Sequence, residues 1–119
     1  MVVVFLSFNC MNKRKTIIQR DSSTCQYCGK YVEDNGIDLH IDHINPKSNG
    51  GNNEKNNLMV SCVRCNLIKG GMTIDEFRDK LSNKFNFYIE ELNKFLCLKI
   101  EKIDSFEFYF EQYGKTKKK

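Results

Sequence analysis

The spacing of apolar residues changes along this chain, and each change predicts a new element. Apolar and polar residues alternate over residues 37–44, which is typical of a strand. Residues 45–57 hold six asparagines, two glycines and the only proline, so they predict a loop. Residues 58–60 then predict a short returning strand, and residues 63–69 predict a short helix that stops at a pair of glycines.

A longer amphipathic helix is predicted in the C-terminal half. Thr73 and Glu76 form a capping box, so this helix should begin at Ile74, and we expect one break over residues 83–86. Apolar residues recur along it at spacings of three and four; they are Phe77, Leu81, Phe85, Tyr88, Leu92 and Phe95. Helical spacing predicts core packing, so we expect this stripe to pack against itself and the preceding module rather than to stack on bases. The pattern of residues 103–113 fits either a strand or a helix.

The positive charge of the chain is concentrated at its two ends. The net charge is +4, and residues 12–21 predict a short helix that carries Lys13, Arg14, Lys15 and Arg20. The last six residues hold four lysines, whereas the segments between the ends are net negative. The two basic ends could grip an anionic polymer such as DNA, although solubility explains the lysine tail equally well.

Composition limits the class of protein. With 119 residues, 40% hydrophobic and 29% charged, the chain predicts a folded domain with a thin core, for which a structural metal is a common aid. No apolar run approaches the ~20 residues of a membrane span. Residues 1–11 are apolar, but the basic residues follow this stretch instead of preceding it, which argues against a secretory signal. We therefore expect an intracellular, cytoplasmic protein without membrane contact.

Four of the six cysteines form two closely spaced pairs. Cys25 and Cys28 make one C-x-x-C pair, and Cys62 and Cys65 make the other, with 33 residues between the pairs. Thiols stay reduced inside the cell, so disulfides explain these pairs less well than a metal does. Two such pairs can supply four thiolates in the tetrahedral arrangement of structural zinc. Cys97 lies in an apolar stretch and is expected in the core.

A second group of polar residues lies between the cysteine pairs. Asp42 is a hard oxygen ligand that suits Mg²⁺ or a similar ion, and His43, its neighbour in a strand, should point to the opposite face. Asn66 opens the short helix directly after Cys65, and its amide oxygen could complete a two-ligand site with Asp42. Such an open metal site suits phosphodiester hydrolysis, with neutral His43 as the base that deprotonates the attacking water.

Read in order, the segments CQYCG, LHIDHINPKSNGG and NNLMVSCVRCNLIKGG resemble the HNH endonucleases of the zinc-knuckle type. The resemblance covers about residues 12–72. It implies an α+β fold in which a small ββα-metal module (His-Me finger, treble-clef-like) is stapled by a zinc ion on four cysteines, followed here by a C-terminal helical extension. It also implies Asp42 and Asn66 as ligands of the catalytic divalent ion, His43 as general base, and Asn57 as the residue that braces the loop and helps to orient the base. Asn66 stands where the signature often has histidine, which makes this an HNN form.

Several further residues are candidates for contact with DNA. His40 lies two residues before Asp42, and we favour an ordinary hydrogen-bonding role for it over contact with metal or phosphate. For the surface cations near the site, solvated surface charge is nearly as good an explanation as phosphate contact. The candidate DNA-binding residues are Lys13, Arg14, Lys15, Arg20, His40, Lys47, Arg64 and Lys69.

The sequence thus predicts a metal-dependent DNA endonuclease, with a non-catalytic, zinc-stapled nucleic-acid-binding module as the alternative. Zinc is the expected structural ion, and Mg²⁺ or another divalent ion the catalytic one. We expect a dispensable extension over residues 1–11, the nuclease domain over 12–72, a helical extension over 73–113 and a basic tail over 114–119. The helical extension could provide a homodimer face, a DNA clamp or only core. The high asparagine and lysine content is compatible with a phage or mobile element as source.

Overall fold

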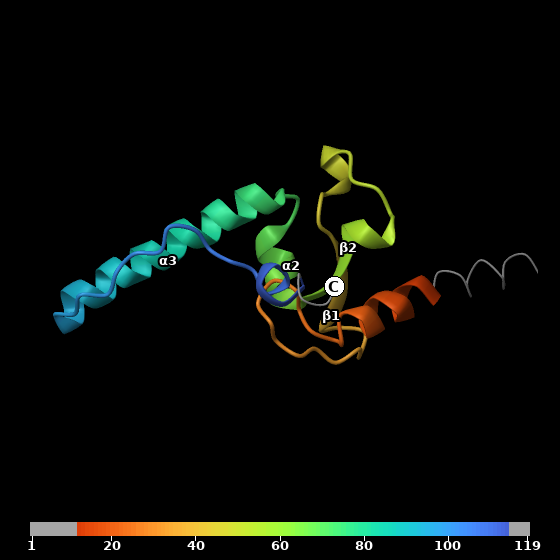
Figure 1. The fold of residues 1–119 in the computed structure, drawn as a ribbon, viewed down its shortest axis with the longest axis horizontal. Coiled ribbons are helices and arrows are strands. Elements are labelled where there is room, and N and C mark those ends of the chain that lie inside the picture. Colours follow the sequence, from red (N-terminus) through yellow and green to blue (C-terminus); the bar gives the residue numbers. More distant parts are fainter. Residues whose placement is uncertain (1–11, 115–119) are drawn as a thin grey trace, which may run out of the picture.

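A two-stranded antiparallel hairpin forms the centre of the fold in the computed structural model, which describes residues 12–114 (Figure 1). Strand β1 (Leu39–His43) pairs with β2 (Leu58–Cys62) in a register that sets His43 opposite Leu58. All five residues of β2 are buried, whereas β1 buries only two of its five. The expected dispensable extension and the lysines of the basic tail lie outside the described residues.

The loop between the strands contains a very close backbone approach. Two short 3₁₀ turns, Lys47–Asn49 and Lys55–Asn57, interrupt it. A Cβ added at Gly51 would stand 1.8 Å from the carbonyl oxygen of Asn45. Only glycine permits this approach, so Gly51 lets the loop fold tightly back toward the end of β1.

Helix α2 (Val63–Lys69) follows β2 without a linker. Cys62 is its N-cap, because the Cys62 Sγ accepts a hydrogen bond from the backbone N–H of Cys65 at 3.4 Å. The helix stops at Gly70, which adopts a φ of 51° and donates its N–H to the carbonyl oxygen of Asn66. Since α2 also contacts both strands, the chain forms the ββα arrangement of the predicted α+β fold, and this prediction is confirmed.

A helix over residues 12–20 leads into the first cysteine pair and packs on the hairpin. Ile17, on its inner side, is buried in the core. Asp21, directly after the helix, is buried as well, and its Oδ2 accepts a hydrogen bond from the backbone N–H of Val60 at 2.9 Å. The predicted basic helix is therefore attached to β2 by both apolar and polar contacts.

Helix α3 (Ile74–Leu96) begins at the predicted residue. Thr73 caps it, since its Oγ1 accepts a hydrogen bond from the backbone N–H of Glu76 at 3.2 Å. The break expected over residues 83–86 was wrong, because the helix is continuous through this stretch.

The segment after α3 runs back along that helix (Figure 1). The side-chain amide of Asn86 donates to the carbonyl oxygen of Ile103 at 2.9 Å and accepts from its N–H at 2.8 Å. Asn86, which the sequence placed in a helix break, thus anchors the returning segment beside the helix. Residues 103–113 form neither a regular strand nor a long α-helix: residues 103–108 are irregular, and a π-helical turn spans Phe110–Gly114.

Three buried aromatic rings join the hairpin module to the C-terminal half. Tyr27, between Cys25 and Cys28, lies 5.4 Å from Phe77 of α3 and 5.5 Å from Phe108, measured between ring centroids. Phe77 and Phe108 lie 5.2 Å apart. Through Phe77, the first part of the apolar stripe packs on the hairpin module as predicted.

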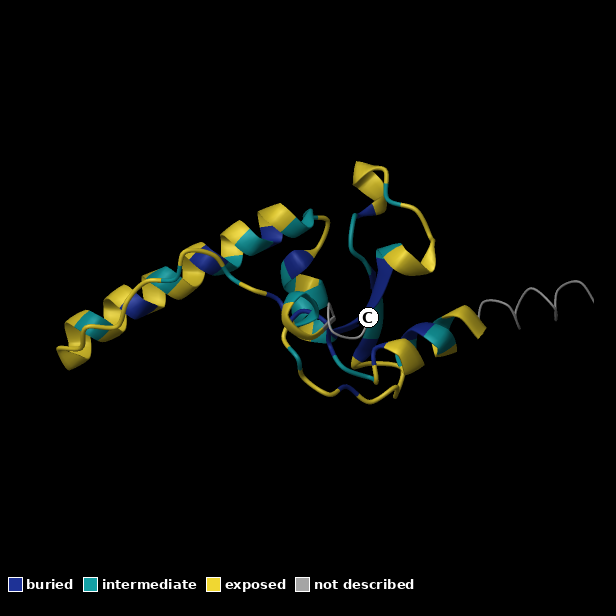
Figure 2. Ribbon diagram, in the orientation of Figure 1, coloured by how far each residue is buried: buried dark blue, intermediate teal, exposed yellow. Residues whose placement is uncertain are grey.

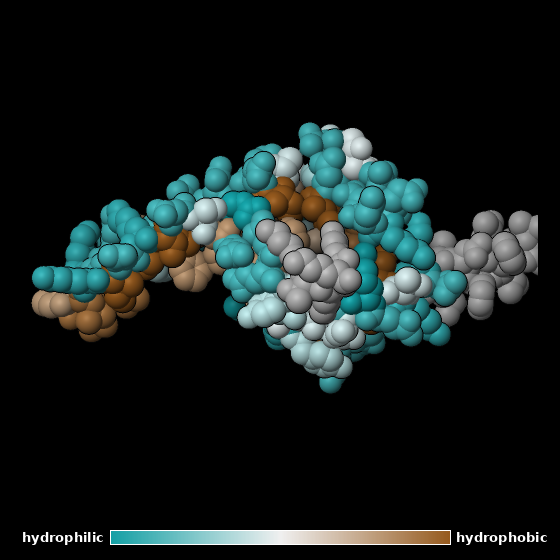
Figure 3. Space-filling model, viewed as in Figure 1, coloured by the Kyte–Doolittle hydropathy of each residue, from teal (hydrophilic) through white to brown (hydrophobic). Residues whose placement is uncertain are grey.

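The distal part of the apolar stripe is uncovered, contrary to expectation (Figure 2). Phe77 is only 1% exposed, but Phe95 is 89% exposed, and Phe85, Tyr88 and Leu92 are exposed as well. Figure 3 shows apolar side chains gathered along this arm of the molecule. The returning segment covers a different side of α3. The apolar spacing therefore predicted an apolar face correctly, but the described part of the chain buries this face only in part.

The projecting arm gives the molecule its elongated shape, 67 × 31 × 27 Å. Cys97, at the end of the arm, is exposed rather than in the core. Within residues 12–114, no helix has both the length and the apolar character needed to cross a membrane.

Candidate metal centre and active site

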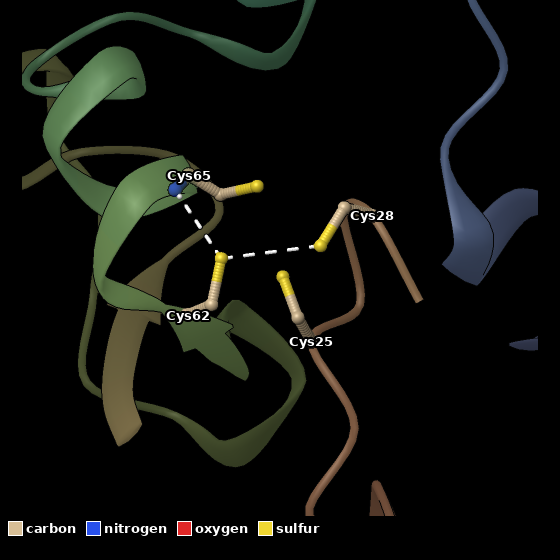
Figure 4. A group of neighbouring side chains, drawn as sticks. All are labelled: Cys25, Cys28, Cys62 and Cys65. Atoms are coloured by element: carbon tan, nitrogen blue, oxygen red, sulfur yellow. Dashed lines mark hydrogen bonds between the residues drawn. The ribbon is translucent and has the colours of Figure 1, made fainter. Parts of the chain in front are cut away.

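The two cysteine pairs meet at one end of the hairpin. Cys25 and Cys28 lie in the turn after the first helix, Cys62 ends β2, and Cys65 lies in the first turn of α2. The four Sγ atoms all lie within 4.8 Å of one another and point toward a common centre (Figure 4). The fold therefore brings together all four predicted zinc ligands, although the pairs are far apart in sequence.

The geometry of this cluster fits a zinc ion. Zinc–sulfur bonds of ~2.3 Å in a tetrahedral arrangement place the sulfurs about 3.8 Å apart. The Sγ atoms of Cys28 and Cys62 are 3.9 Å apart. Four thiolates at this spacing would repel one another without a cation between them, so the chemistry of the ligands also suits a bound metal.

The thiols already ionise unequally without a cation. Hydrogen bonds from Cys28 and Cys65 hold the pKa of Cys25 far below its ordinary value. The hydrogen bond to Cys25 raises the pKa of Cys28 to about 11, and contacts with Cys25 and Cys28 raise that of Cys65 further. The cluster therefore favours one thiolate by itself, and full ionisation needs the positive charge of a metal.

Asp42 lies on the buried side of β1 and has two partners. The hydroxyl of Tyr27 donates to Asp42 Oδ2 at 2.5 Å, and the Lys69 ammonium lies 3.1 Å from the same oxygen. Lys69 also donates to the carbonyl oxygen of His43 at 2.8 Å. Both partners contact Oδ2, so within residues 12–114 they leave the other carboxylate oxygen of Asp42, Oδ1, for a further ligand.

Tyr27 is a permanent donor to this carboxylate. Burial, followed by the negative charge of Asp42, raises the pKa of Tyr27 well above its ordinary value. The hydroxyl therefore keeps its proton at any physiological pH, and Asp42 keeps a fixed orientation.

The position of Lys69 corrects a prediction. The sequence suggested a surface lysine that contacts phosphate, but Lys69 is 0% exposed. The last turn of α2 carries its side chain to Asp42 and His43, where the carboxylate compensates the buried charge. In this conformation Lys69 supports the candidate site from inside and cannot touch DNA.

His43 faces different surroundings from its neighbour Asp42. The imidazole is half-buried, and its Nε2 lies 2.8 Å from the side-chain oxygen Oδ1 of Asn53 in the loop. The strand thus separates a buried carboxylate from an accessible imidazole, as expected for adjacent residues.

Asn57 holds the loop between the strands. Its Oδ1 accepts from the backbone N–H of Asn45 at 2.8 Å, and its Nδ2 donates to the carbonyl oxygens of Asn45 and Asn52 at 3.0 and 2.8 Å. Asn57 therefore links the two sides of the loop, whereas the residue in contact with His43 is Asn53.

The two other predicted site residues are Asn66, in α2, and His40, in β1. Asn66 is half-buried in α2, a helix that contacts the strand carrying Asp42. His40 Nε2 lies 2.9 Å from the carbonyl oxygen of Ile37. The contact of His40 is an ordinary hydrogen bond to the backbone, the role that the sequence favoured.

Two of the candidate DNA-binding cations are engaged with the loop. Arg20 binds Asp21 through two hydrogen bonds and donates to the carbonyl oxygens of Lys55 and Leu58. Lys13 donates to the carbonyl oxygen of Asn53 at 3.0 Å. These contacts attach the first helix to the loop and to the start of β2.

Four candidate cations lie on the surface of the molecule: Arg14, Lys15, Lys47 and Arg64. Arg14 forms a surface ion pair with Asp34 at 2.6 Å. Lys15, Lys47 and Arg64 are exposed.

Sequence reasoning missed two residues that contact the Asp-His pair, Tyr27 and Asn53, and gave the third, Lys69, a role in DNA contact instead. A buried carboxylate requires hydrogen-bond donors, but the sequence alone does not say which donors the fold brings to Asp42. Nothing in the sequence separates Asn53 from the other asparagines of the loop.

Comparison with known proteins assigns the central module to a family. Residues 25–71 match the family model described as HNH endonuclease. Over 54 residues, the chain is 37% identical to the CRISPR-associated endonuclease Cas9 of Corynebacterium diphtheriae. This match covers 44% of the present chain but only 5% of that relative. No solved structure matches the chain significantly.

The zinc-type cysteine cluster, the ββα order and the family match together define a nuclease-type metal module. Residues 25–71 therefore carry the HNH endonuclease module that the sequence predicted.

Proposed function

We propose that the chain is a divalent-metal-dependent endonuclease that hydrolyses phosphodiester bonds in DNA. The observation that supports this most directly is the pair at the end of β1, where a fixed, buried Asp42 adjoins an accessible His43. Both lie on an HNH endonuclease domain. A binding module without catalysis would not need the accessible imidazole beside that carboxylate.

In this proposal His43 is the general base. Its ring is accessible to water and is held from one side by Asn53. A neutral imidazole can take a proton from water near physiological pH. His43 would therefore generate the nucleophile that attacks the phosphorus.

Asp42 and Asn66 would hold the catalytic ion. Carboxylate and amide oxygens are the ligands that Mg²⁺ and similar ions prefer, and Tyr27 and Lys69 leave Asp42 Oδ1 for such a ligand. When bound there, a divalent ion would neutralise charge on the phosphate and the leaving oxygen. The expected products carry 5′-phosphate and 3′-hydroxyl ends.

The exposed cations near the hairpin would hold the DNA backbone. Lys15, Lys47 and Arg64 are accessible and have the charge that phosphate contact requires. One active site cuts one strand, so we expect nicking by a single copy of the chain.

Nicking of a supercoiled plasmid by the zinc-loaded protein, with Mg²⁺ or Mn²⁺, tests the proposal. His43→Ala should lower the rate by roughly 100-fold or more, because it removes the base. The chain has two histidines, so His40→Ala is a matched control, and it should cut at close to the normal rate. Equal activity of the wild type and His43→Ala would refute the role of His43.

One observation favours the alternative, a nucleic-acid-binding module without catalysis. Asp42 already pairs with a buried lysine, an arrangement that a purely structural carboxylate would also adopt. Tight binding of DNA without cleavage in Mg²⁺, Mn²⁺ or other divalent ions would support this second function.

A further inference from the structure

The side chain of Asn53 contacts His43 from a loop position ten residues further along the chain. The distance from His43 Nε2 to Asn53 Oδ1 is 2.8 Å, which is a good hydrogen bond. The contact is local and direct, whereas Asn57, the asparagine expected to orient the base, binds backbone groups of the loop.

An amide oxygen can only accept a hydrogen bond. In a neutral imidazole one ring nitrogen carries the proton and the other carries the lone pair. A hydrogen bond to Asn53 Oδ1 therefore requires the proton of His43 to be on Nε2. The lone pair, and with it the capacity to accept a proton, is then on Nδ1.

The loop holds Asn53 in place from two directions. Lys13 Nζ, on the first helix, donates to the Asn53 carbonyl oxygen at 3.0 Å. The preceding residue, Asn52, accepts from Asn57 Nδ2 at 2.8 Å through its carbonyl oxygen. The side chain of Asn52 accepts from the backbone N–H of Glu54 at 3.1 Å. The acceptor for His43 is thus positioned by contacts to both the helix and the loop.

We propose that Asn53 is a positioning residue that fixes the neutral tautomer of His43 with its proton on Nε2, so that Nδ1 is the atom that accepts the proton from water. The statement about the tautomer concerns the ground state of the protein. The catalytic part of the statement depends on the proposed nuclease function.

Nitrogen-15 NMR of the two imidazole rings tests the tautomer without DNA or a catalytic ion. His40 is an internal reference, because its Nε2 faces the carbonyl oxygen of Ile37, which also only accepts. In the zinc-loaded wild type at a pH where both rings are neutral, both should show the Nε2–H pattern. Asn53→Leu should convert His43 to a mixture of tautomers and leave His40 unchanged.

Two further variants separate the role of the acceptor from general disturbance of the loop. Asn53→Asp keeps an acceptor oxygen and should retain the Nε2–H form of His43. Asn56→Leu, at an exposed position of the same loop, should change neither ring. A wild-type His43 with its proton on Nδ1, or an Asn53→Leu protein with an unchanged His43 pattern, would overturn the proposal.

Plasmid nicking then tests the catalytic part. Asn53→Leu should lower kcat by roughly 10- to 100-fold with little change in KM, as loss of a group that orients a catalytic side chain does. Asn53→Asp should recover most of the rate. An Asn53→Leu enzyme with normal kcat would refute the positioning role. An inactive wild type with the expected tautomer would instead refute the nuclease function and leave the assignment of the ring proton intact.

Discussion

Lys69 carries a positive charge at a position with no exposed surface. Its ammonium lies 3.1 Å from Asp42 and 2.8 Å from the carbonyl oxygen of His43. Removing one partner of a buried ion pair leaves the other charge uncompensated in a poorly polarisable environment. The stability of the module and the orientation of the candidate metal ligand therefore depend on the same side chain.

We expect Lys69→Ala to lower the free energy of unfolding by roughly 3–5 kcal/mol, because Asp42 would stay buried without its cation. Urea unfolding of the zinc-loaded protein, followed by circular dichroism, measures this. The matched control is Lys47→Ala, at an exposed lysine, which should change stability by less than about 0.5 kcal/mol. Similar small effects of the two substitutions would contradict the role of the ion pair.

The ion pair also changes how Asp42 should be tested. From the sequence alone, Asp42→Ala would be expected to remove activity and keep the fold. The structure indicates that this substitution also leaves Lys69 buried without its carboxylate. Asp42→Asn keeps the shape of the side chain and is the better variant for separating loss of activity from loss of stability.

At the residue scale, the sequence revealed the chemistry-bearing residues but not their partners. The Asp42–His43 pair stood out because a hard ligand and a base are adjacent in a predicted strand. The burial of Lys69 could not be predicted, since lysine is almost always exposed unless it is paired. Its pairing depends on where the last turn of α2 lies relative to β1. The spacing of residues along the sequence does not determine this position.

Helix α3 shows a sharp change in environment along one apolar stripe. Phe77 packs against Tyr27 and Phe108, whereas Phe95 at the other end of the helix is 89% exposed. The same residue type, on the same face, therefore has two very different energetic roles.

Phe77→Ala should destabilise the protein by about 3–5 kcal/mol, because it leaves a cavity in the aromatic cluster. Phe95→Ala, in the same helix, should change the free energy of unfolding by less than about 0.5 kcal/mol. Thermal unfolding of the two variants provides the comparison. A large cost at Phe95 would show that the distal face is covered in solution.

At the element scale, local signals predicted helix starts and ends well. The capping box at Thr73 and the glycines after residue 69 act on the backbone nearby, so α3 begins and α2 ends where the sequence indicates. The expected break over residues 83–86 is absent from α3. Asn86 binds Ile103, a residue 17 positions away, and sequence reasoning could not know that this segment returns along the helix.

At the scale of the whole molecule, the four-cysteine cluster adds a second link between segments that also share the apolar core. The cluster connects the first turn of α2 to the knuckle that follows the N-terminal helix. A metal that binds only the folded state contributes its binding free energy to folding.

Removal of zinc by a strong chelator should therefore unfold the hairpin module, seen as loss of the circular dichroism signal and of nicking activity. Cys62→Ala should have the same effect in the presence of zinc. Cys97→Ala is the matched control, since this cysteine is exposed on the arm, and it should keep the fold and bind a normal amount of zinc. A native Cys62→Ala protein would refute a structural role for the metal.

The two cysteine pairs flank the hairpin, and this arrangement bears on the order of folding. Closing a flexible loop has an entropic cost that grows with its length, and 33 residues separate Cys28 from Cys62. Pairing of the strands sets Leu39 opposite Cys62, so a formed hairpin leaves only residues 29–38 to be closed. Metal capture should therefore follow strand pairing, and a substitution that weakens the hairpin should first appear as slow uptake of zinc.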